Sequence, residues 1–322
     1  MSKKTKQDLS RNSRKSRALK EKARPTSKDT EQPKEALPDD LVEKFSNEVQ
    51  DLSDPEKEAL RSAFELATRL FRPGDQSMED AGPLADKLVL VTNASGGMGA
   101  SIALAMAEAG AHAFLHYKDH EEQALKIKAE IEQLNRQCVL HRADLSNAAE
   151  VHDLVSMIEK HHSHVDVLIN NPTTHVPRSV EGTDEGIWDR TLNGNLGAAY
   201  HLIEAIVPGM ITRKWGRIIN LTSMMWQIGG GCPPYVASMA GLIGLTRAHA
   251  GRLAKDGVTA NAITLGIFEG EETTTDPPIS SDLIPVLRYG NSEQVIIVIL
   301  MLACNDYITG QSINVNGGVV MS

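Results

Sequence analysis

The chain has few aromatic residues, very little cysteine and no long apolar run. Phe, Trp and Tyr make up 4% of its 322 residues, and the three cysteines (Cys138, Cys232 and Cys304) are far apart and form no CxxC pair. Scattered, unpaired cysteines argue against a disulfide framework or a zinc site and are typical of a reducing cytoplasm. No run approaches the roughly 18 apolar residues of a membrane span, and the first thirty residues lack the apolar segment of a signal peptide. We therefore expect a cytoplasmic globular protein.

The charge of the chain is uneven along its length. The whole chain carries −9 at pH 7, but residues 1–24 contain ten Lys and Arg against two acidic residues, a net charge of +8 that leaves −17 on the rest. A basic segment attached to an acidic body is typical of contact with nucleic acid, an anionic surface or an acidic partner. It is also typical of a solvated, disordered tail without a dedicated partner, and we favour this second interpretation.

The first eighty residues divide into two zones. Residues 1–37 are rich in Lys, Arg, Ser and Pro and show no apolar period, so we expect a disordered basic tail. Residues 38–80 are predicted to form a helical hairpin extension, because apolar residues recur at helical spacing over 41–52 and again over 59–71. Such stripes need a partner surface. We expect it on the main domain or on a neighbouring subunit rather than on a foreign protein.

From residue 86 to residue 322 the sequence alternates between short apolar runs and longer amphipathic stretches. The apolar runs are predicted to be strands buried on both faces, and a predicted helix follows most of them. Repeated strand–helix units indicate one α/β domain with a parallel sheet between two layers of helices. The predicted strands are 87–91, 112–117, 138–142, 165–170, 216–223, 258–264 and 311–317, and the predicted helices are 97–109, 120–136, 148–161, 187–211, 235–254 and 292–303.

The segment TNASGGMG, Thr92–Gly99, directly follows the first predicted strand and opens a helix. Gly97 and Gly99 would let backbone amides approach a pyrophosphate at the positive end of that helix. A glycine-rich turn alone is weak evidence for nucleotide binding. Its place between a strand and a helix, at the start of an alternating domain, strengthens the prediction of a dinucleotide site.

Residues 86–322 resemble the short-chain dehydrogenase/reductase family, and in particular its 3-oxoacyl-carrier-protein reductase-like members. TNASGGMG resembles the family's glycine-rich turn, ADL at Ala143–Leu145 resembles the segment with its adenine-contacting aspartate, and VDVLINNPT at 165–173 resembles its D-x-L-x-N-N-A-G motif. YITGQSINVNGG at 307–318 resembles the C-terminal segment that packs across subunits in the family's tetramers. The resemblance implies a Rossmann-type, doubly wound parallel sheet in three layers, α/β/α, and a homotetramer.

The resemblance also implies roles for individual residues. In the family reaction a hydride leaves the nicotinamide for a carbonyl carbon, while a tyrosine protonates the oxygen and a serine holds it by a hydrogen bond. These catalytic roles fall to Tyr235 and Ser223, and Asn195 stands at the helix position of the family's catalytic asparagine. The substrate is expected to be a small carbonyl compound, and no metal is implied. The residues expected to bind the cofactor are Thr92, Asn93, Ser95, Gly97, Met98, Gly99, Tyr117, Lys118, Asp144, Leu145, Asn171 and Gly266.

The end of the second predicted strand bears on which nicotinamide cofactor is used. NAD-preferring members usually end this strand with an acidic residue that holds the ribose hydroxyls. Here the strand ends His116-Tyr117-Lys118, and Asp119 comes only later. A cation in place of an acid favours the 2′-phosphate of NADP over NAD. Against this, Gly96 occupies a turn position where many NADP-binding members carry arginine.

Three loop positions depart from the family's pattern. Asn93 replaces the first glycine of the turn, and Asn is among the few residues that tolerate positive φ, so we expect this change to be tolerated. Pro172-Thr173 replaces Ala-Gly, which removes a backbone donor and stiffens the loop, and we expect weaker cofactor binding. Leu265-Gly266 replaces Pro-Gly beside the nicotinamide, and we expect fewer contacts with its carboxamide group.

The most serious departure is Met239, four residues after Tyr235, where the family has a lysine. That lysine anchors the nicotinamide ribose, lowers the tyrosine pKa and passes protons onward, and a thioether can do none of these. Free tyrosine has a pKa of about 10, so we expect Tyr235 to stay protonated at pH 7 and to act as an acid. The prediction is a slow enzyme that favours carbonyl reduction over alcohol oxidation, with Met239 as a flexible apolar filler.

Two other hypotheses remain open. One is a pseudoenzyme that acts as a nucleotide-binding scaffold or assembly partner, which Met239, the altered loops and the N-terminal addition favour. The other is non-redox chemistry, in which Ser223 and Tyr235 activate a substrate without hydride transfer. The histidines at 161, 162 and 164 resemble a metal cluster but are expected to form a solvated turn. Residues 268–281 are expected to form a lid over the reactive end of the cofactor.

Overall fold

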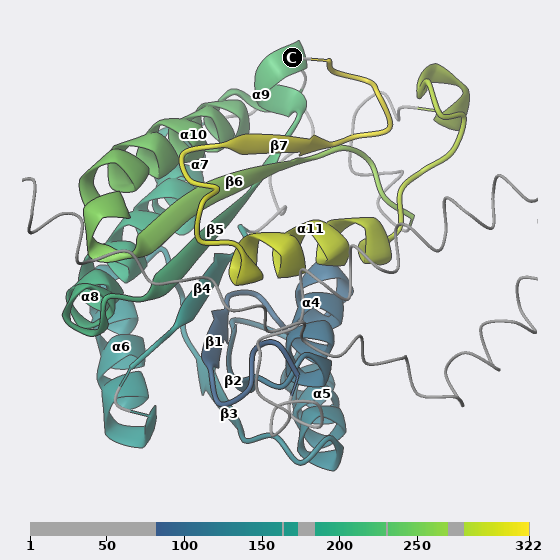
Figure 1. Cartoon of the computed structure of the whole chain (residues 1–322). Coiled ribbons are helices and arrows are strands. Elements are labelled where there is room, and N and C mark those ends of the chain that lie inside the picture. The colour runs from purple at the N-terminus through teal and green to yellow at the C-terminus, as the bar shows by residue number, and fades with distance from the viewer. Residues whose placement is uncertain (1–81, 163, 173–183, 230, 270–279, 322) are drawn as a thin grey trace, which may run out of the picture. The chain divides into compact units, whose positions relative to one another are not determined.

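The computed structural model describes residues 82–321 apart from residue 163, residues 173–183, residue 230 and residues 270–279. These residues form a seven-stranded parallel sheet with the strand order β3-β2-β1-β4-β5-β6-β7 (Figure 1). This is the predicted Rossmann-type, doubly wound arrangement, in which the chain order reverses between β1 and β4. The predicted basic tail over 1–37 and the predicted helical extension over 38–80 lie outside the described residues.

All seven predicted strands are present, and each pairs in parallel with its neighbours. The longest pairing joins β5 to β6 over eight residues, from Gly216 opposite Val258 to Ser223 opposite Leu265. The strands are β1 (Leu88–Val91), β2 (His112–Tyr117), β3 (Cys138–Arg142), β4 (Val167–Asn170), β5 (Gly216–Ser223), β6 (Val258–Leu265) and β7 (Ser312–Val315).

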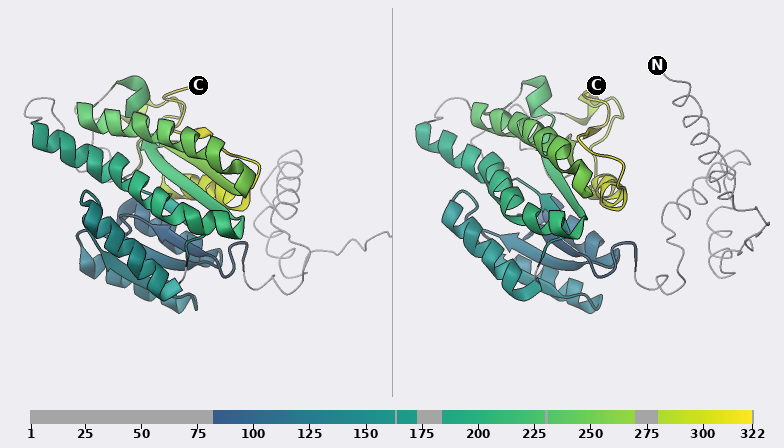
Figure 2. Two further views of the ribbon diagram at one scale, coloured as in Figure 1. Left: turned by 90° about the vertical axis from the view of Figure 1, so that its left-hand side faces the viewer. Right: turned by 60° about the vertical axis from the view of Figure 1, so that its left-hand side comes forward.

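Helices cover both faces of the sheet, as the views in Figure 2 show. One face packs against α4 (Gly97–Glu108), α5 (Glu121–Gln133) and α11 (Ser292–Cys304). The other packs against α6 (Ala148–His162), α8 (Ala198–Arg213) and α10 (Pro233–Leu253). The remaining elements are α7 (Glu185–Leu192), the π-helix η2 (Asn193–Gly197), α9 (Met225–Ile228) and the 3₁₀ turns η3 (Ala254–Asp256) and η4 (Ser281–Leu283).

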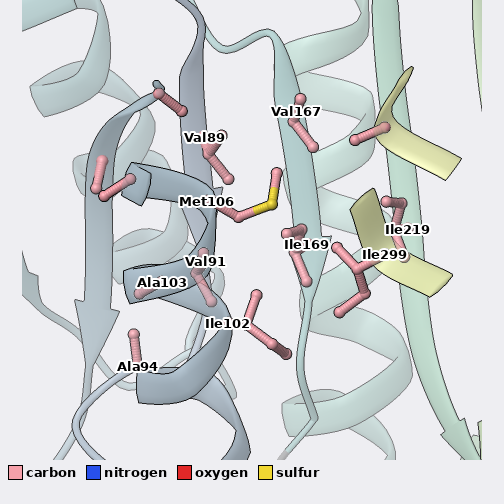
Figure 3. Packing of buried hydrophobic residues seen from close by; sticks show 14 of the residues in the cluster. Val89, Val91, Ala94, Ile102, Ala103, Met106, Val167, Ile169, Ile219 and Ile299 are labelled. Atoms are coloured by element: carbon pink, nitrogen blue, oxygen red, sulfur yellow. The ribbon is translucent and has the colours of Figure 1, made fainter. Parts of the chain in front are cut away.

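The central strands are apolar on both faces because each face is covered. Along β1, Val89 and Val91 point into the cluster on the α4 side, and Leu88 and Leu90 belong to the cluster on the α6 side. Figure 3 shows the first cluster, where Met106 of α4 lies between β1 and β4. Full burial of each such side chain stabilises the fold by about 1.5–3 kcal/mol. The strands are therefore held firmly, and so are their carboxyl ends, which form the site.

One predicted helix is wrong in detail. The stretch predicted as a single helix over 187–211 is α7, the π-helix η2 and α8 in succession. It begins at Glu185, and the preceding residue Asp184 caps it, because the Asp184 side chain accepts a hydrogen bond from the backbone N–H of Ile187 at 2.7 Å. π-Helices are rare, occur mostly as single turns inside α-helices and are frequent at functional sites. The buried Asn195 lies in this turn.

Candidate active site

A cavity of about 700 Å³ lies at the carboxyl ends of β1 to β4, where the order of the strands reverses. Its size falls within the range of roughly 300–1,000 Å³ that is usual for small-molecule and cofactor sites. In open parallel sheets, ligands bind at this end of the strands and at this switch point. Its lining residues are Asn93, Ser95, Gly96, Gly97, Met98, Gly99, His116, Lys118, Asp119, His120, Asp144, Leu145, Ser146, Asn171, Pro172, Ile187, Arg190, Thr191 and Gly194.

The glycine-rich turn presents bare backbone to this cavity. Gly96 precedes α4 without a capping side chain, and a Cβ added at Gly96 or Gly97 would meet no atom within 4 Å. Gly97 has φ +52°, a left-handed conformation that favours glycine. Gly99 is required for packing instead, because a Cβ there would lie 2.2 Å from the carbonyl oxygen of Asn93. The turn therefore exposes amides at the positive end of α4, which suits an anionic ligand.

Asn93 has φ +49°, as expected for a residue at the position of a turn glycine. Its side chain ties the turn to the end of β4, because Nδ2 donates to the carbonyl oxygen of Asn171 at 2.5 Å. Nδ2 of Asn171 donates in return to the carbonyl oxygen of Asn93 at 3.3 Å. Thr92 adds two hydrogen bonds between its hydroxyl and the backbone of Asn171, at 2.8 and 3.1 Å. The substitution of glycine is thus compensated by hydrogen bonds that the asparagine itself supplies.

His116, at the end of β2, is a site residue that the sequence interpretation missed. Its side chain is almost fully buried yet borders the cavity. Nδ1 accepts a hydrogen bond from the backbone N–H of Asn93 at 3.1 Å, and Nε2 lies 2.9 Å from the carbonyl oxygen of Ala143. Burial lowers the pKa of His116 to about 4, so the ring is neutral near pH 7. It then accepts at Nδ1 and donates from Nε2.

Lys118 and Asp144 form an ion pair of 2.7 Å on the same wall of the cavity. Burial raises the pKa of Asp144, but hydrogen bonds from Lys118 and Ser146 outweigh it and hold that pKa below its usual value. Ser146 donates to Asp144 from its backbone at 3.0 Å and from its hydroxyl at 2.7 Å. The Lys118 side chain is about half exposed, so a phosphate group can reach its ammonium and compete with Asp144 for it.

The three predicted catalytic residues lie on neighbouring elements at the next strand of the sheet. Ser223 ends β5, where its Oγ accepts a hydrogen bond from the N–H of Met225 at 3.3 Å. Tyr235 lies in the first turn of α10, and the buried Asn195 lies in η2. Ser238 links the last two, since Nδ2 of Asn195 donates to its Oγ at 3.2 Å and that hydroxyl donates to the carbonyl oxygen of Tyr235 at 2.7 Å.

Met239 is fully buried in an apolar cluster directly beside Tyr235. Ala199 and Leu242 are the other buried members, and the half-buried Leu196, Trp226, Tyr235 and Leu245 pack against them. The backbone of Met239 is fixed by a hydrogen bond from the hydroxyl of Thr222 to its carbonyl oxygen at 3.0 Å. The position where the resemblance predicts a lysine is therefore filled by a close-packed thioether.

The structure brings most of the predicted cofactor residues together. Nine line the cavity: Asn93, Ser95, Gly97, Met98, Gly99, Lys118, Asp144, Leu145 and Asn171. Thr92, Tyr117 and Gly266 are not among its lining residues. Thr92 acts through its bonds to Asn171, and Tyr117 is buried. Gly266 is a packing glycine, because a Cβ there would lie 2.6 Å from Cα of Asn316.

The large cavity does not include Ser223, Asn195 or Tyr235 among its described lining residues. Asn195 borders a second, much smaller cavity of about 10 Å³ between the turn, η2 and α8. The expected lid over 268–281 lies mostly outside the described residues. Of its first residues, Phe268 forms a parallel bridge with Gly290. The cofactor end of the site is thus defined more fully than its substrate end.

Two negative findings concern the part of the chain that the structure describes. No group of three or more His, Cys, Asp or Glu residues there is placed to hold a metal ion. No helix there combines the length and apolar character needed to cross a membrane.

A doubly wound parallel sheet with a glycine-rich turn facing a cavity at its switch point defines a dinucleotide-binding protein of the Rossmann type. Residues 87–278 match the short chain dehydrogenase family. The chain belongs to this short-chain dehydrogenase/reductase family and is one of its oxidoreductase enzymes. Family members use a nicotinamide cofactor, act on small molecules and are typically oligomeric.

Several known proteins are similar to this chain. The 3-oxoacyl-(acyl-carrier-protein) reductase of Staphylococcus epidermidis is 34% identical over 246 residues, which cover 73% of this chain and all of that protein. The corresponding reductase of Synechocystis is 35% identical, covering 74% of this chain and 98% of the relative. A crystal structure described as a short-chain alcohol dehydrogenase from Sinorhizobium meliloti 1021 has a TM-score of 0.67 and 32% identity, covering 73% of this chain and 97% of that one.

Proposed function

We propose that the protein is an NADP(H)-dependent reductase of a small carbonyl compound, of the ketone or 3-oxoacyl type. The observation that carries this proposal is the 700 Å³ cavity at the strand ends, lined by the glycine-rich turn, Lys118 and Asp144. Ser223, Tyr235 and Asn195 lie on the elements that follow along the sheet. The name of the reductases that are 34% and 35% identical supports a 3-oxoacyl substrate attached to a carrier.

The lining of the cavity fits a dinucleotide along its length. The open amides of the turn at Gly97 would hold the pyrophosphate at the start of α4. Asp144 and Leu145 would contact the adenine, and the half-exposed Lys118 would meet the 2′-phosphate of NADP. The cavity volume is that of a cofactor site. An ammonium at this end favours NADP over NAD, because a phosphate gains a charge-assisted hydrogen bond there.

The residues beyond the cofactor would handle the oxygen of the substrate. The nicotinamide, when bound, supplies a hydride for the carbonyl carbon. Tyr235 would donate its phenolic proton to the carbonyl oxygen, and Ser223 would donate a hydrogen bond to the same atom. Asn195 would keep η2 fixed against α10 through Ser238. Met239 places no cation beside Tyr235, so we propose slow turnover that favours reduction.

Binding and chemistry are tested separately. Titration of the protein with NADPH, followed by nucleotide fluorescence, should give saturable binding that NADH matches only at higher concentration. Purified protein should then oxidise NADPH in the presence of a panel of ketones and 3-oxoacyl thioesters. Alcohol oxidation at pH 7 should be slower than reduction. Rapid oxidation of alcohols would contradict the role assigned to Tyr235, and absence of NADPH binding would reject the proposal as a whole.

Met239→Lys sharpens the test, with Met239→Leu as the matched control. Lysine should raise the rate of reduction, because positioned proton transfer is typically worth about 10²- to 10⁴-fold and a nearby cation tunes the acid. Met239→Lys should also lower the free energy of unfolding, because it places a charge among packed apolar side chains. Leucine fills a similar volume without charge, and its activity should stay within about twofold of the wild type.

Two observations favour a second candidate function. The apolar packing around Met239 and the absence of Tyr235 from the described lining of the large cavity fit a nucleotide-binding protein with impaired hydride transfer. Such a protein would serve as a scaffold or assembly partner. It would bind NADPH as tightly as an active relative and would oxidise it with none of the carbonyl compounds, whereas Met239→Lys would restore turnover.

A further inference from the structure

We infer that His116 is a positioning residue for coenzyme binding. Its ring forms one hydrogen bond to the turn that meets the pyrophosphate and another to the segment at the adenine end of the cavity. This inference rests on the proposed function, because it concerns the binding of NADPH. It assigns a role to a side chain that the interpretation of the sequence treated as part of a buried strand. The argument has three parts: the bond to the turn, the bond to the segment before Asp144, and the neutral state of the ring.

The first bond fixes the turn after β1. The backbone N–H of Asn93 points at Nδ1 of His116 at 3.1 Å. Asn93 has a left-handed backbone and also bonds through its side chain to Asn171. Its carbonyl oxygen lies against Gly99, the second glycine of α4. A shift in the position of the Asn93 amide should therefore also shift the first turn of α4, which meets the pyrophosphate.

The second bond fixes the segment after β3. Nε2 of His116 lies 2.9 Å from the carbonyl oxygen of Ala143, the residue before Asp144. Asp144 pairs with Lys118, two residues beyond His116 in the chain. One imidazole thus contacts the segment that precedes Asp144, the residue assigned to the adenine, and lies two residues before Lys118, the residue assigned to the 2′-phosphate. It spans the distance between these residues and the turn that meets the pyrophosphate.

The neutral state of the ring is required for both bonds at once. A protonated imidazole has no acceptor, so the N–H of Asn93 would lose its partner. The ring is 1% exposed and burial disfavours its charged form. The titratable groups that act on it are His141 of β3, Asp144 and Glu150 of α6. Of these, the two carboxylates favour protonation and His141 opposes it, and burial outweighs them.

Two conservative substitutions separate the two bonds. In His116→Asn, the side-chain oxygen reaches the place of Nδ1 and can still accept from Asn93, but nothing reaches Ala143. In His116→Gln, the longer amide can still donate to Ala143, but the N–H of Asn93 is left buried without an acceptor. Loss of either hydrogen bond should weaken the affinity for NADPH by about tenfold, because a buried polar group is then left unsatisfied.

Two probes identify which bond matters for which part of the coenzyme. Adenosine 2′-monophosphate contains the adenine, the ribose and the 2′-phosphate but no pyrophosphate. His116→Gln should therefore weaken NADPH about tenfold and leave adenosine 2′-monophosphate within twofold of the wild type. His116→Asn should weaken both ligands. In both variants kcat at saturating NADPH should stay within about twofold, because the change acts on KM for the coenzyme.

His112→Gln is the matched control. His112 begins the same strand, and its Nδ1 accepts from the backbone N–H of Gln137 at 3.0 Å, at the opposite end of β2 from the cavity. Its substitution should lower the melting temperature without changing the affinity for NADPH. The inference is overturned if His116→Gln binds NADPH within twofold of the wild type, or if both His116 variants weaken the two ligands equally. Failure of the wild type to bind NADPH would instead reject the proposed function.

Discussion

The two halves of the candidate site differ in polarity. The coenzyme half is polar, with a bridging histidine, two asparagines and an ion pair around an open cavity. The catalytic half contains an apolar cluster, in which Met239 and Trp226 pack beside Tyr235. In the proposed function, holding the nucleotide and moving the proton therefore depend on separate parts of this molecule. Substitutions in one half should therefore leave the other half working.

Removal of the phenolic hydroxyl should have the largest effect. Tyr235→Phe keeps the ring in its apolar contacts and removes the proton donor, so kcat for carbonyl reduction should fall by about 10²- to 10⁴-fold. NADPH affinity, measured by fluorescence titration, should not change. Tyr200→Phe, at an exposed tyrosine of α8, is the control and should retain full activity. An unchanged kcat in Tyr235→Phe would mean that another group supplies the proton.

The pH dependence of stability tests the polar half. The pKa of His116 is about 4 in the folded protein against 6.5 for the free side chain, so as pH falls the unfolded chain takes up the proton first. The stabilisation is complete above pH 6.5 and is lost between about pH 6.5 and 4. This shift corresponds to about 3 kcal/mol of unfolding free energy.

Urea unfolding at a series of pH values measures this loss, with His116→Asn as the comparison. The variant lacks the titrating group but keeps His141, Asp144 and Glu150, so its stability should fall less steeply over the same range. Parallel curves for the two proteins would show that His116 is not responsible for the loss.

Gly99→Ala should weaken coenzyme binding through the backbone. The added Cβ would lie 2.2 Å from the carbonyl oxygen of Asn93, so the turn must move, at a cost of about 1–3 kcal/mol. The affinity for NADPH should fall by about tenfold or more. Gly244→Ala on α10, where a Cβ meets nothing within 4 Å, is the matched control. Equal affinities in the two variants would contradict the close packing described for the turn.

Lys118→Gln should have the smallest effect and should change selectivity. Loss of the ammonium removes a charge-assisted contact with the 2′-phosphate, so NADPH affinity should fall by about tenfold while NADH affinity stays the same. Lys126→Gln, on the exposed face of α5, controls for the loss of a positive charge nearby. Isothermal titration with both nucleotides gives the ratio. An equal loss of affinity for NADH would show that Lys118 does not contact the 2′-phosphate.

The strand positions could be predicted from the sequence because each is a short apolar run between turn residues. All seven occur, and the glycine-rich turn lies where its place between a strand and a helix predicts. Nine of the twelve predicted cofactor residues line one cavity. These predictions succeed because they need only local sequence patterns. Once the strands are known to be parallel, their carboxyl ends must lie together at one edge of the sheet.

The missed features depend on contacts between distant segments. His116 lies in an apolar strand, and its two partners are 23 and 27 residues away in the chain. Arg190, Thr191 and Gly194 line the cavity, and they lie on a stretch predicted as one continuous helix that in fact contains the π-helix η2. The apolar cluster around the Met239 side chain is formed by η2, α8, α9 and α10 together. Periodicity along one segment contains none of this information.

The π-turn at Asn193–Gly197 also sets the phase between two helices. Each residue of an α-helix rotates the chain by about 100°, and a π-turn holds one residue more than the regular spacing allows. This offset lets Ile187 and Arg190 of α7 face the cavity while Leu202 and Ile203 of α8 face the core. Deletion of Gly194 would restore an unbroken α-helix. Either the α7 residues would then turn away from the cavity, or the α8 residues would turn away from the core.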